Sequence, residues 1–214
     1  MNYHQMITRS QSGFSMIELM VVIVIMGIVM AIGIPSFNTW IENGQIRTGT
    51  ESLSNGINLA RTEAIRRNEP VRFRFDPAFK STWDICAQDT PPVTPPTFAA
   101  CPVGPSNPLG NNVLHARYDH QGSSNVQIGT ASAMGAAGTA LATGLGAGAT
   151  SITFDGLGRL VPGVNNAVRV DVVNPKLATT KMRRLVIQIS IGGQVRTCDP
   201  DPSLLLSNDP RRCT

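Results

Sequence analysis

A continuous apolar segment near the N-terminus constrains the fold of this chain more than any other feature. Residues 14–37 contain no Lys, Arg or His, and Glu18 is their only acid. As an α-helix, this segment is long enough to cross a hydrocarbon core of about 30 Å. A charge near the centre of a bilayer costs roughly 2.5–3.5 kcal/mol, and less towards the interface. Glu18 therefore predicts a functional site whose cationic partner comes from outside the segment.

The polar leader ahead of the apolar segment indicates where this partner arises. Residues 1–13 have Arg9 as their only Lys or Arg, and they lack the apolar stretch of a secretory signal peptide. Cleavage between Gly13 and Phe14 would leave the whole hydrophobic helix on the mature chain. It would also create an α-amine four residues before Glu18. An amine on one copy and a carboxylate on its neighbour could then neutralise each other within the membrane.

The junction GFSMIE at residues 13–18 resembles the prepilin leader junction of type IV pilins and type II secretion pseudopilins. The resemblance implies cleavage after Gly13 by the prepilin peptidase and N-methylation of Phe14. It also implies that Glu18 pairs with the N-terminus of an adjacent subunit during filament assembly. The alternative interpretation is an ordinary signal anchor with a chance acid.

The flanks of the apolar segment predict its orientation. Because Arg9 precedes the segment, the weak positive-inside signal places the N-terminus in the cytoplasm. The family resemblance places the body of the chain in the periplasm, as a single-pass inner-membrane protein that later joins a pilus or pseudopilus filament. It also implies helix-loosening residues at Gly27 and Pro35. Proline lacks a backbone N–H, so Pro35 predicts a kink where the helix leaves the membrane.

The helix is expected to continue beyond the membrane as an amphipathic half over residues 38–69. Pro70 cannot donate a helical hydrogen bond, so the helix should end near Asn68 or Glu69. Apolar side chains recur on one helical face, which predicts packing on a globular domain; these are Ile46, Leu53, Ile57, Ala60 and Ala64.

A period of two follows the helix and predicts β-strands. Val71, Phe73 and Phe75 alternate with Arg72 and Arg74, the pattern of a half-buried strand. Further strands are predicted at residues 83–87, 125–129, 151–154, 159–161, 167–173, 184–191 and 195–198, with tight turns at 154–159 and 191–194.

This series of strands after one long helix predicts an α+β fold, in which a mostly antiparallel sheet covers the helix. Residues 70–214 would form the β-rich domain. Two loops are expected within it, a Pro-rich one at 90–112 and an Ala- and Gly-rich one at 131–150. The alternative for the second is a small-residue strand that packs against another copy.

Four cysteines allow three pairings. We favour Cys86–Cys101 and Cys198–Cys213, because each pair is separated by fifteen residues and encloses a Pro-, Asp- or Asn-rich loop. Each loop closure is worth about 3 kcal/mol in the chain-entropy model. A zinc site is the competing interpretation, but the sequence has no CxxC motif or nearby His pair to support it.

The body of the chain narrows the family resemblance. LARTEAIRRNEPVRF at residues 59–73, the turn at 154–159 and a basic hairpin before Cys198 resemble the H-type pseudopilin group. This group contains the GspH-type pseudopilins and the FimT/FimU-type minor pilins. The resemblance implies a non-enzymatic minor subunit, with other pilin or pseudopilin subunits, the prepilin peptidase, an inner-membrane assembly platform and membrane lipid as partners. A major pilin is the alternative, and both pilus and secretion machinery remain open.

The sequence predicts no enzyme, cofactor or metal site. His4, His115 and His120 are scattered, and no nucleophile elbow or phosphate-binding loop is present. Asp199 and Asp201 flank a proline but lack the remaining ligand spacing of a calcium loop.

DNA binding is a separate hypothesis. The net charge of +4 is modest but uneven, since residues 159–214 contain nine Lys or Arg against four acids. Some FimT-type relatives bind DNA through a Gly-Arg-x-Arg hairpin, and here GQVR at 193–196 lacks the first arginine. The alternative is a solvated basic face, or one that meets an acidic neighbour. The candidate phosphate-binding residues are Arg183, Arg184, Arg196, Arg211 and Arg212.

Overall fold

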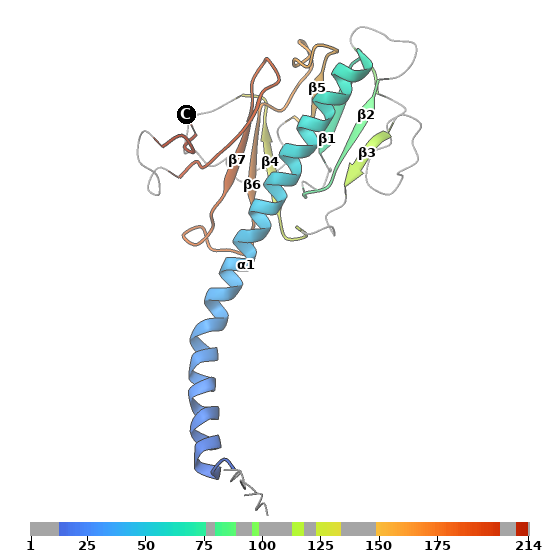
Figure 1. Cartoon of the computed structure of the whole chain (residues 1–214). Coiled ribbons are helices and arrows are strands. Elements are labelled where there is room, and N and C mark those ends of the chain that lie inside the picture. The colour runs from blue at the N-terminus through green and yellow to red at the C-terminus, as the bar shows by residue number, and fades with distance from the viewer. Residues whose placement is uncertain are drawn as a thin grey trace, which may run out of the picture. The chain divides into compact units, whose positions relative to one another are not determined.

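The computed structural model describes residues 13–75, 80–88, 96–98, 113–117, 123–133, 149–201 and 209–213. In these residues one long helix precedes eight strands (Figure 1). The elements are α1 (Met16–Arg67), β1 (Val71–Phe75), β2 (Trp83–Ala87), β3 (Val113–Arg117), β4 (Gln127–Ala131), β5 (Ser151–Phe154), β6 (Arg169–Val173), β7 (Leu185–Ile189) and β8 (Val195–Cys198). The chain forms two compact units, Met1–Trp40 and Ile41–Thr214.

The first unit contains the apolar part of α1. Its most apolar window of eighteen residues has a mean hydropathy of 2.8, and no residue of that window is buried. By length and composition this helix could cross a membrane. Gly27 and Pro35 both lie within α1, which is continuous through them. The loosening expected at these two positions stays a prediction.

In the second unit, α1 packs against two antiparallel sheets, which confirms the α+β fold with a long helix on antiparallel β-structure. The first sheet has the strand order β3-β2-β1-β5 and the second β4-β6-β7-β8. Every pair in them is antiparallel. We expected one sheet. The chain instead enters the second sheet at β4, returns to the first at β5 and then completes the second, which strand periodicity alone does not reveal.

Most strands lie where the period-two pattern predicted them. β4 begins two residues later than expected, and residues 159–161 contribute only an isolated bridge between Phe154 and Leu160. β3 was not predicted. Its residues are exposed or half-buried without alternation, so its sequence lacks the signal of a strand with one buried face.

α1 ends at Arg67, one residue before Asn68, close to the end predicted from Pro70. Asn68 adopts a left-handed conformation (φ 53°), which asparagine tolerates better than most residues. Its N–H donates to the carbonyl of Ile65, and the N–H of Glu69 donates to the carbonyl of Ala64, both at 3.3 Å. This is a Schellman cap, which satisfies carbonyls that the last helical turn leaves open.

The predicted apolar face of α1 forms the core with both sheets. Ile46, Leu53, Ile57, Ala60 and Ala64 are all fully buried. Buried side chains from both sheets belong to the same cluster, including Phe73, Phe154, Val170 and Ile187. Helix and sheet approach closely at Gly56, where a Cβ atom would lie 2.8 Å from the rings of Phe73 and Trp83.

The two predicted loops fall largely outside the described residues. Of residues 90–112 the structure describes 96–98, where the Phe98 ring is buried and the Arg72 guanidinium lies 4.0 Å from the ring centroid. Of residues 131–150 it describes 131–133 and 149–150. The leader before Gly13, with His4, also lies outside the described residues, as do Cys101 and His120.

Candidate functional site

The first candidate site is the start of α1. Glu18 lies in the first helical turn, and its side chain is exposed, as are Phe14 and Met16. The N–H of Leu19 donates to the carbonyl of Ser15 at 3.2 Å, which closes this turn. A carboxylate is favoured at this end because the helix dipole is positive there. Cleavage after Gly13 and methylation of Phe14 stay predictions.

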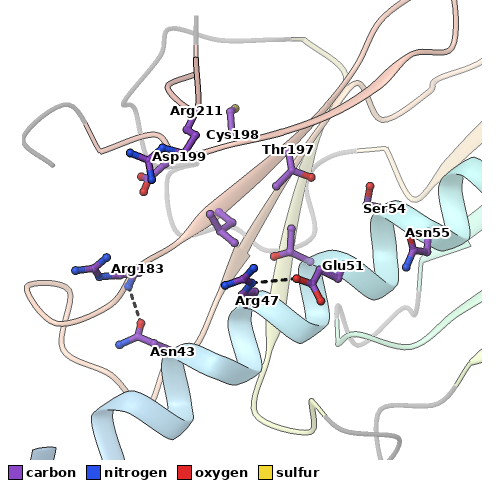
Figure 2. A pocket seen from close by; sticks show the side chains of 12 residues that line it. Asn43, Arg47, Glu51, Ser54, Asn55, Arg183, Thr197, Cys198, Asp199 and Arg211 are labelled. Atoms are coloured by element: carbon purple, nitrogen blue, oxygen red, sulfur yellow. Dashed lines mark hydrogen bonds and ion pairs between the residues drawn. The ribbon is translucent and has the colours of Figure 1, made fainter. Parts of the chain in front are cut away.

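The second candidate site is a polar groove of about 660 Å³ within the second unit. Figure 2 shows that α1, the segment before β7, β8 and the C-terminal turn all contribute to it. We call it the β8 groove, and it is lined by Asn43, Arg47, Thr50, Glu51, Ser54, Asn55, Arg183, Leu185, Thr197, Cys198, Asp199 and Arg211.

The Cys198–Cys213 disulfide is present, as predicted, and it positions one wall of the β8 groove. Both cysteines are buried, and their Cα atoms are 5.0 Å apart. The N–H of Asp199 donates to the carbonyl of Arg211 at 2.7 Å, and the N–H of Cys213 donates to the carbonyl of Asp199 at 3.0 Å. The disulfide and this short parallel bridge hold the C-terminal segment beside the end of β8.

Of the other predicted disulfide, the structure describes only Cys86. Cys86 is disulfide-bonded and fully buried in β2. Its predicted partner Cys101 lies outside the described residues, so the Cys86–Cys101 pairing stays a prediction.

The structure brings only two of the five candidate DNA-binding arginines, Arg183 and Arg211, into the β8 groove. Arg196 instead braces the C-terminal segment, because its Nη2 donates to the carbonyls of Pro210 at 2.8 Å and Arg212 at 3.1 Å. Arg184 is half-buried before β7, and Arg212 forms a backbone bridge with Asp199. DNA binding by this basic face stays a prediction.

Arg211 already has an acidic partner. Its Nε and Nη2 donate to the Asp209 carboxylate at 3.1 and 2.8 Å, and its backbone N–H donates to the same carboxylate at 2.8 Å. The side-chain bond to Arg211, followed by the backbone bond, lowers the pKa of Asp209 to about 2. The same side-chain bond raises the pKa of Arg211. This pair reduces the charge that Arg211 offers to an external anion.

Most groove residues were not identified as site residues from the sequence, among them Asn43, Glu51 and Asp199. Asn43 holds the segment before β7 against α1, because its Oδ1 accepts from the N–H of Arg183 at 2.8 Å and its Nδ2 donates to the carbonyl of Lys181 at 3.0 Å. Glu51 pairs with Arg47 at 3.0 Å. Asp199 was considered only as a calcium ligand. The signal was present in α1, where the polar residues Asn43, Arg47, Thr50 and Ser54 follow the same helical period as the core face.

The three body segments that carried the family resemblance meet in space. Arg61 of α1 donates from Nε to the carbonyl of Gly158 at 3.0 Å, and its Nη2 lies 3.5 Å from the carbonyl of Gly192. The N–H of Leu160 donates to the carbonyl of Ile191 at 3.0 Å. The two predicted turns therefore pack on each other and are joined to the helix by one guanidinium.

Metal chemistry has no support in the part of the chain that the structure describes, since it contains no group of three or more His, Cys, Asp or Glu placed to hold a metal ion. His115 lies on β3, with its Nε2 4.0 Å from a carboxylate oxygen of Glu63. Glu63 itself is bound by two arginines of α1, Arg66 and Arg67. The Arg66 side-chain bond, acting against burial, lowers the pKa of the Glu63 carboxyl.

Comparison with known proteins identifies relatives in fimbriae. A fimbrial protein of Dichelobacter nodosus is 38% identical over 68 residues, which cover 32% of this chain and 42% of that protein. A type IV major fimbrial protein FimA of the same organism is 43% identical over 49 residues, or 23% of this chain and 30% of that protein. The matched stretch thus spans less than half the length of these curated relatives.

Two solved structures of the Pseudomonas aeruginosa type IV minor pilin FimU resemble this structure. The crystal form in space group P21 gives a TM-score of 0.46 at 17% identity and covers 82% of this chain and 99% of that chain. The form in space group P65 gives 0.43 at 16% identity, with 78% and 99% covered.

Two family profiles match the chain directly. Residues 8–34 match the prokaryotic N-terminal methylation motif, and residues 49–193 match type II transport protein GspH. The second match covers more than half of the chain and includes α1 from Gly49 onwards, the turn at 154–159 and strands β1 to β7. The chain is therefore a member of the type IV pilin family, a structural and non-enzymatic protein in which an N-terminal methylation motif precedes a GspH domain.

Proposed function

We propose that this chain is a minor subunit of a type IV pilus or type II secretion filament. The prepilin peptidase would remove residues 1–13, Phe14 would be N-methylated, and the subunit would enter the filament through α1. The observation that carries this proposal is the uncovered apolar part of α1 with Glu18 in its first turn. An apolar helix that no described residue covers needs lipid, or the equivalent helices of other subunits, around it.

Glu18 and the new N-terminus have complementary roles in this proposal. Before assembly, the helix lies in the inner membrane with its N-terminus towards the cytoplasm and its body in the periplasm. On assembly, the carboxylate of Glu18 meets the α-amine of Phe14 from a neighbouring copy. In surroundings of low dielectric constant, two opposite charges attract far more strongly than in water, which selects the register in which they meet. The Cys198–Cys213 disulfide supports an oxidising compartment for the body.

The proposed minor role rests on the body of the chain. Residues 49–193 match GspH, which is described as a type II transport protein, whereas the similarity to a fimbrial protein extends over only 68 residues. We place the subunit in priming or at the tip, where its disulfide-braced domain contacts other minor subunits. A deletion distinguishes the two machineries. If the chain is a secretion subunit, its deletion should abolish export of secreted enzymes while pili persist. If it is a minor pilin, its deletion should abolish pili or twitching.

Glu18→Ala tests the assembly step. The variant should insert in the membrane and lose its leader as the wild type does, because the apolar segment and the residues at the cleavage junction are unchanged. It should not be incorporated into filaments, as measured by its amount in sheared filament fractions. Asn58→Ala is the matched control, since Asn58 is an exposed polar residue of the same helix that lies outside both the apolar segment and the β8 groove. Normal incorporation of Glu18→Ala would contradict the proposed function.

A further inference from the structure

β8 is the last strand of the second sheet, and its backbone has an open side. The N–H of Ser190 donates to the carbonyl of Gln194, so Ser190 and Gln194 are a hydrogen-bonded pair. In an antiparallel ladder every second pair is hydrogen-bonded, which identifies the residues of β8 that bond to β7. Arg196 and Cys198 therefore bond towards β7, and Val195 and Thr197 direct their N–H and C=O groups away from it. Within the described residues, no strand pairs with Val195 or Thr197 on this side.

Asp199 shows that the open side of β8 accepts an extended chain. Like Val195 and Thr197, Asp199 directs its backbone groups away from β7. Its N–H donates to the carbonyl of Arg211, and its carbonyl accepts from the N–H of Cys213, both in the C-terminal segment. The bridge between Asp199 and Arg212 is parallel and isolated. Among the described residues, the edge is thus capped at one end by the C-terminal segment and left open at Val195 and Thr197.

Thr197, one of the two open outward residues of β8, lines the β8 groove. On its other side, the polar residues of α1 from Asn43 to Ser54 face the groove. They span eleven residue steps, or about 16 Å of helix. A strand rises about 3.3 Å per residue, so this length matches roughly five residues of extended chain.

Charge indicates which side chain that strand should carry. Arg47 is paired with Glu51, and Arg211 with Asp209. The guanidinium of Arg183 makes no hydrogen bond or ion pair with any residue that the structure describes, and it is exposed at the mouth of the groove. A carboxylate beside Arg183 would complete the pairing of the arginines that line the groove.

A peptide fits this groove better than a nucleic acid. Phosphates would meet the carboxylates of Glu51 and Asp199 on the groove wall, and the residues that line the groove include no aromatic side chain for base stacking. The outward backbone groups of Val195 and Thr197 alternate as donor and acceptor, and another peptide backbone is the group that matches this alternation.

We propose that an extended segment of a neighbouring filament subunit adds to β8 as a fifth strand and places an Asp or Glu side chain against Arg183. The inference rests on the proposed function, because it takes the partner from the filament. Docking of this kind would let a minor subunit select its neighbour by backbone pairing and one charge, independently of the apolar helix.

The test is site-specific photo-crosslinking of the full-length chain in cells that assemble the filament. A benzophenone amino acid replaces Ser54, which lines the groove, or Ile191, an exposed residue of the β7–β8 turn outside it. Mass spectrometry of the Ser54 adduct should identify a segment of another filament subunit that contains an acidic residue. The Ile191 position should not give this adduct.

Two pairs of variants assign the adduct to the proposed contacts. Arg183→Glu should lower its yield at least about tenfold, as expected from losing a charge-assisted hydrogen bond, whereas Arg183→Lys should retain it. Thr197→Pro removes the outward N–H without touching the ladder to β7 and should abolish the adduct, whereas Thr197→Val should retain it. Quantitative formation of the Cys198–Cys213 disulfide shows that each variant has folded.

The outcomes that overturn the inference differ from those that overturn the proposed function. A chain that enters filaments normally but gives no Ser54 adduct contradicts strand docking alone. An adduct that is unchanged by Arg183→Glu and Thr197→Pro, or that is removed by nuclease, also contradicts it. Normal assembly of Glu18→Ala contradicts the filament proposal instead, whatever the Ser54 adduct shows.

Discussion

The carbonyl oxygen of Gly158 occupies the space into which a Cβ atom on Gly193 would project. Both glycines have positive φ angles, 75° for Gly158 and 78° for Gly193. The two turns that carry them come from different sheets, since Gly158 follows β5 and Gly193 lies between β7 and β8. This contact therefore helps to fix the position of the first sheet relative to the second at one end of α1.

Gly193→Ala should destabilise the domain by about 2–3 kcal/mol, because it combines a left-handed backbone with a clash against a backbone atom that cannot rotate away. Gly163→Ala is the matched control. Gly163 has a similar φ of 76°, but a Cβ there would meet nothing within 4 Å, so only the cost of the left-handed conformation, about 1–2 kcal/mol, should appear. Thermal unfolding of the full chain in detergent measures both, and equal losses would contradict the packing argument.

Arg61→Met should cost about 1–3 kcal/mol of stability, because it removes the hydrogen bond to the carbonyl of Gly158 while retaining most of the aliphatic stem. Arg47→Met is a useful comparison from the same helix. Arg47 makes an exposed ion pair with Glu51, a kind of contact that contributes about 0–1 kcal/mol. Denaturant midpoints of the two variants should differ accordingly. A neutral Arg61→Met would show that Arg61 does not hold the turns together.

The parts of the fold that could be predicted are those encoded locally. The apolar spacing on α1 identified the buried face, because the helical period places these side chains on one side of the helix. Pro70 identified the helix end, because it has no backbone N–H to donate to the helix. β1 was visible because its alternate residues meet core and solvent. β3 was not, since its side chains are half-buried or exposed without alternation, and the two that pack on buried residues, Val113 and Leu114, are adjacent in the sequence.

The candidate site could be predicted only in part, because the sequence shows which side chains are charged but not which groups they contact in the fold. Arg196 was predicted to bind phosphate, but its guanidinium donates hydrogen bonds to two carbonyls of the C-terminal segment. Arg211 is held by an acid two residues away. The β8 groove depends on which strand lies at the edge of the second sheet, and strand order is a property of long-range pairing that periodicity does not carry.

The C-terminal turn should titrate at unusually low pH. Asp209 has a pKa of about 2, against an ordinary value of 3.8, because Arg211 and the backbone stabilise its ionised form. A lowered pKa in the folded state means that this contribution to stability is complete above pH 4 and is lost as the pH falls from about 4 to 2. The carboxyl resonance of Asp209 should therefore have its NMR midpoint near 2. Arg211→Ala should move this midpoint up towards 3.8, and an unchanged midpoint would rule out Arg211 as the cause.

Arg169 and Asp171 form a buried ion pair on β6. Arg169 donates from Nε and Nη2 to the Asp171 carboxylate at 2.9 and 3.1 Å, and both residues are only 3% exposed. They lie two apart on one strand and so share a face. Arg169→Met would leave a buried carboxylate without its guanidinium, which should cost about 3–5 kcal/mol. The double variant Arg169→Met/Asp171→Val should cost less than the sum of the two single variants, because it removes both charges together. Both side chains have further contacts, so the double variant should remain below the wild type. Additive losses in urea unfolding would mean that the two residues stabilise β6 independently and not as a pair.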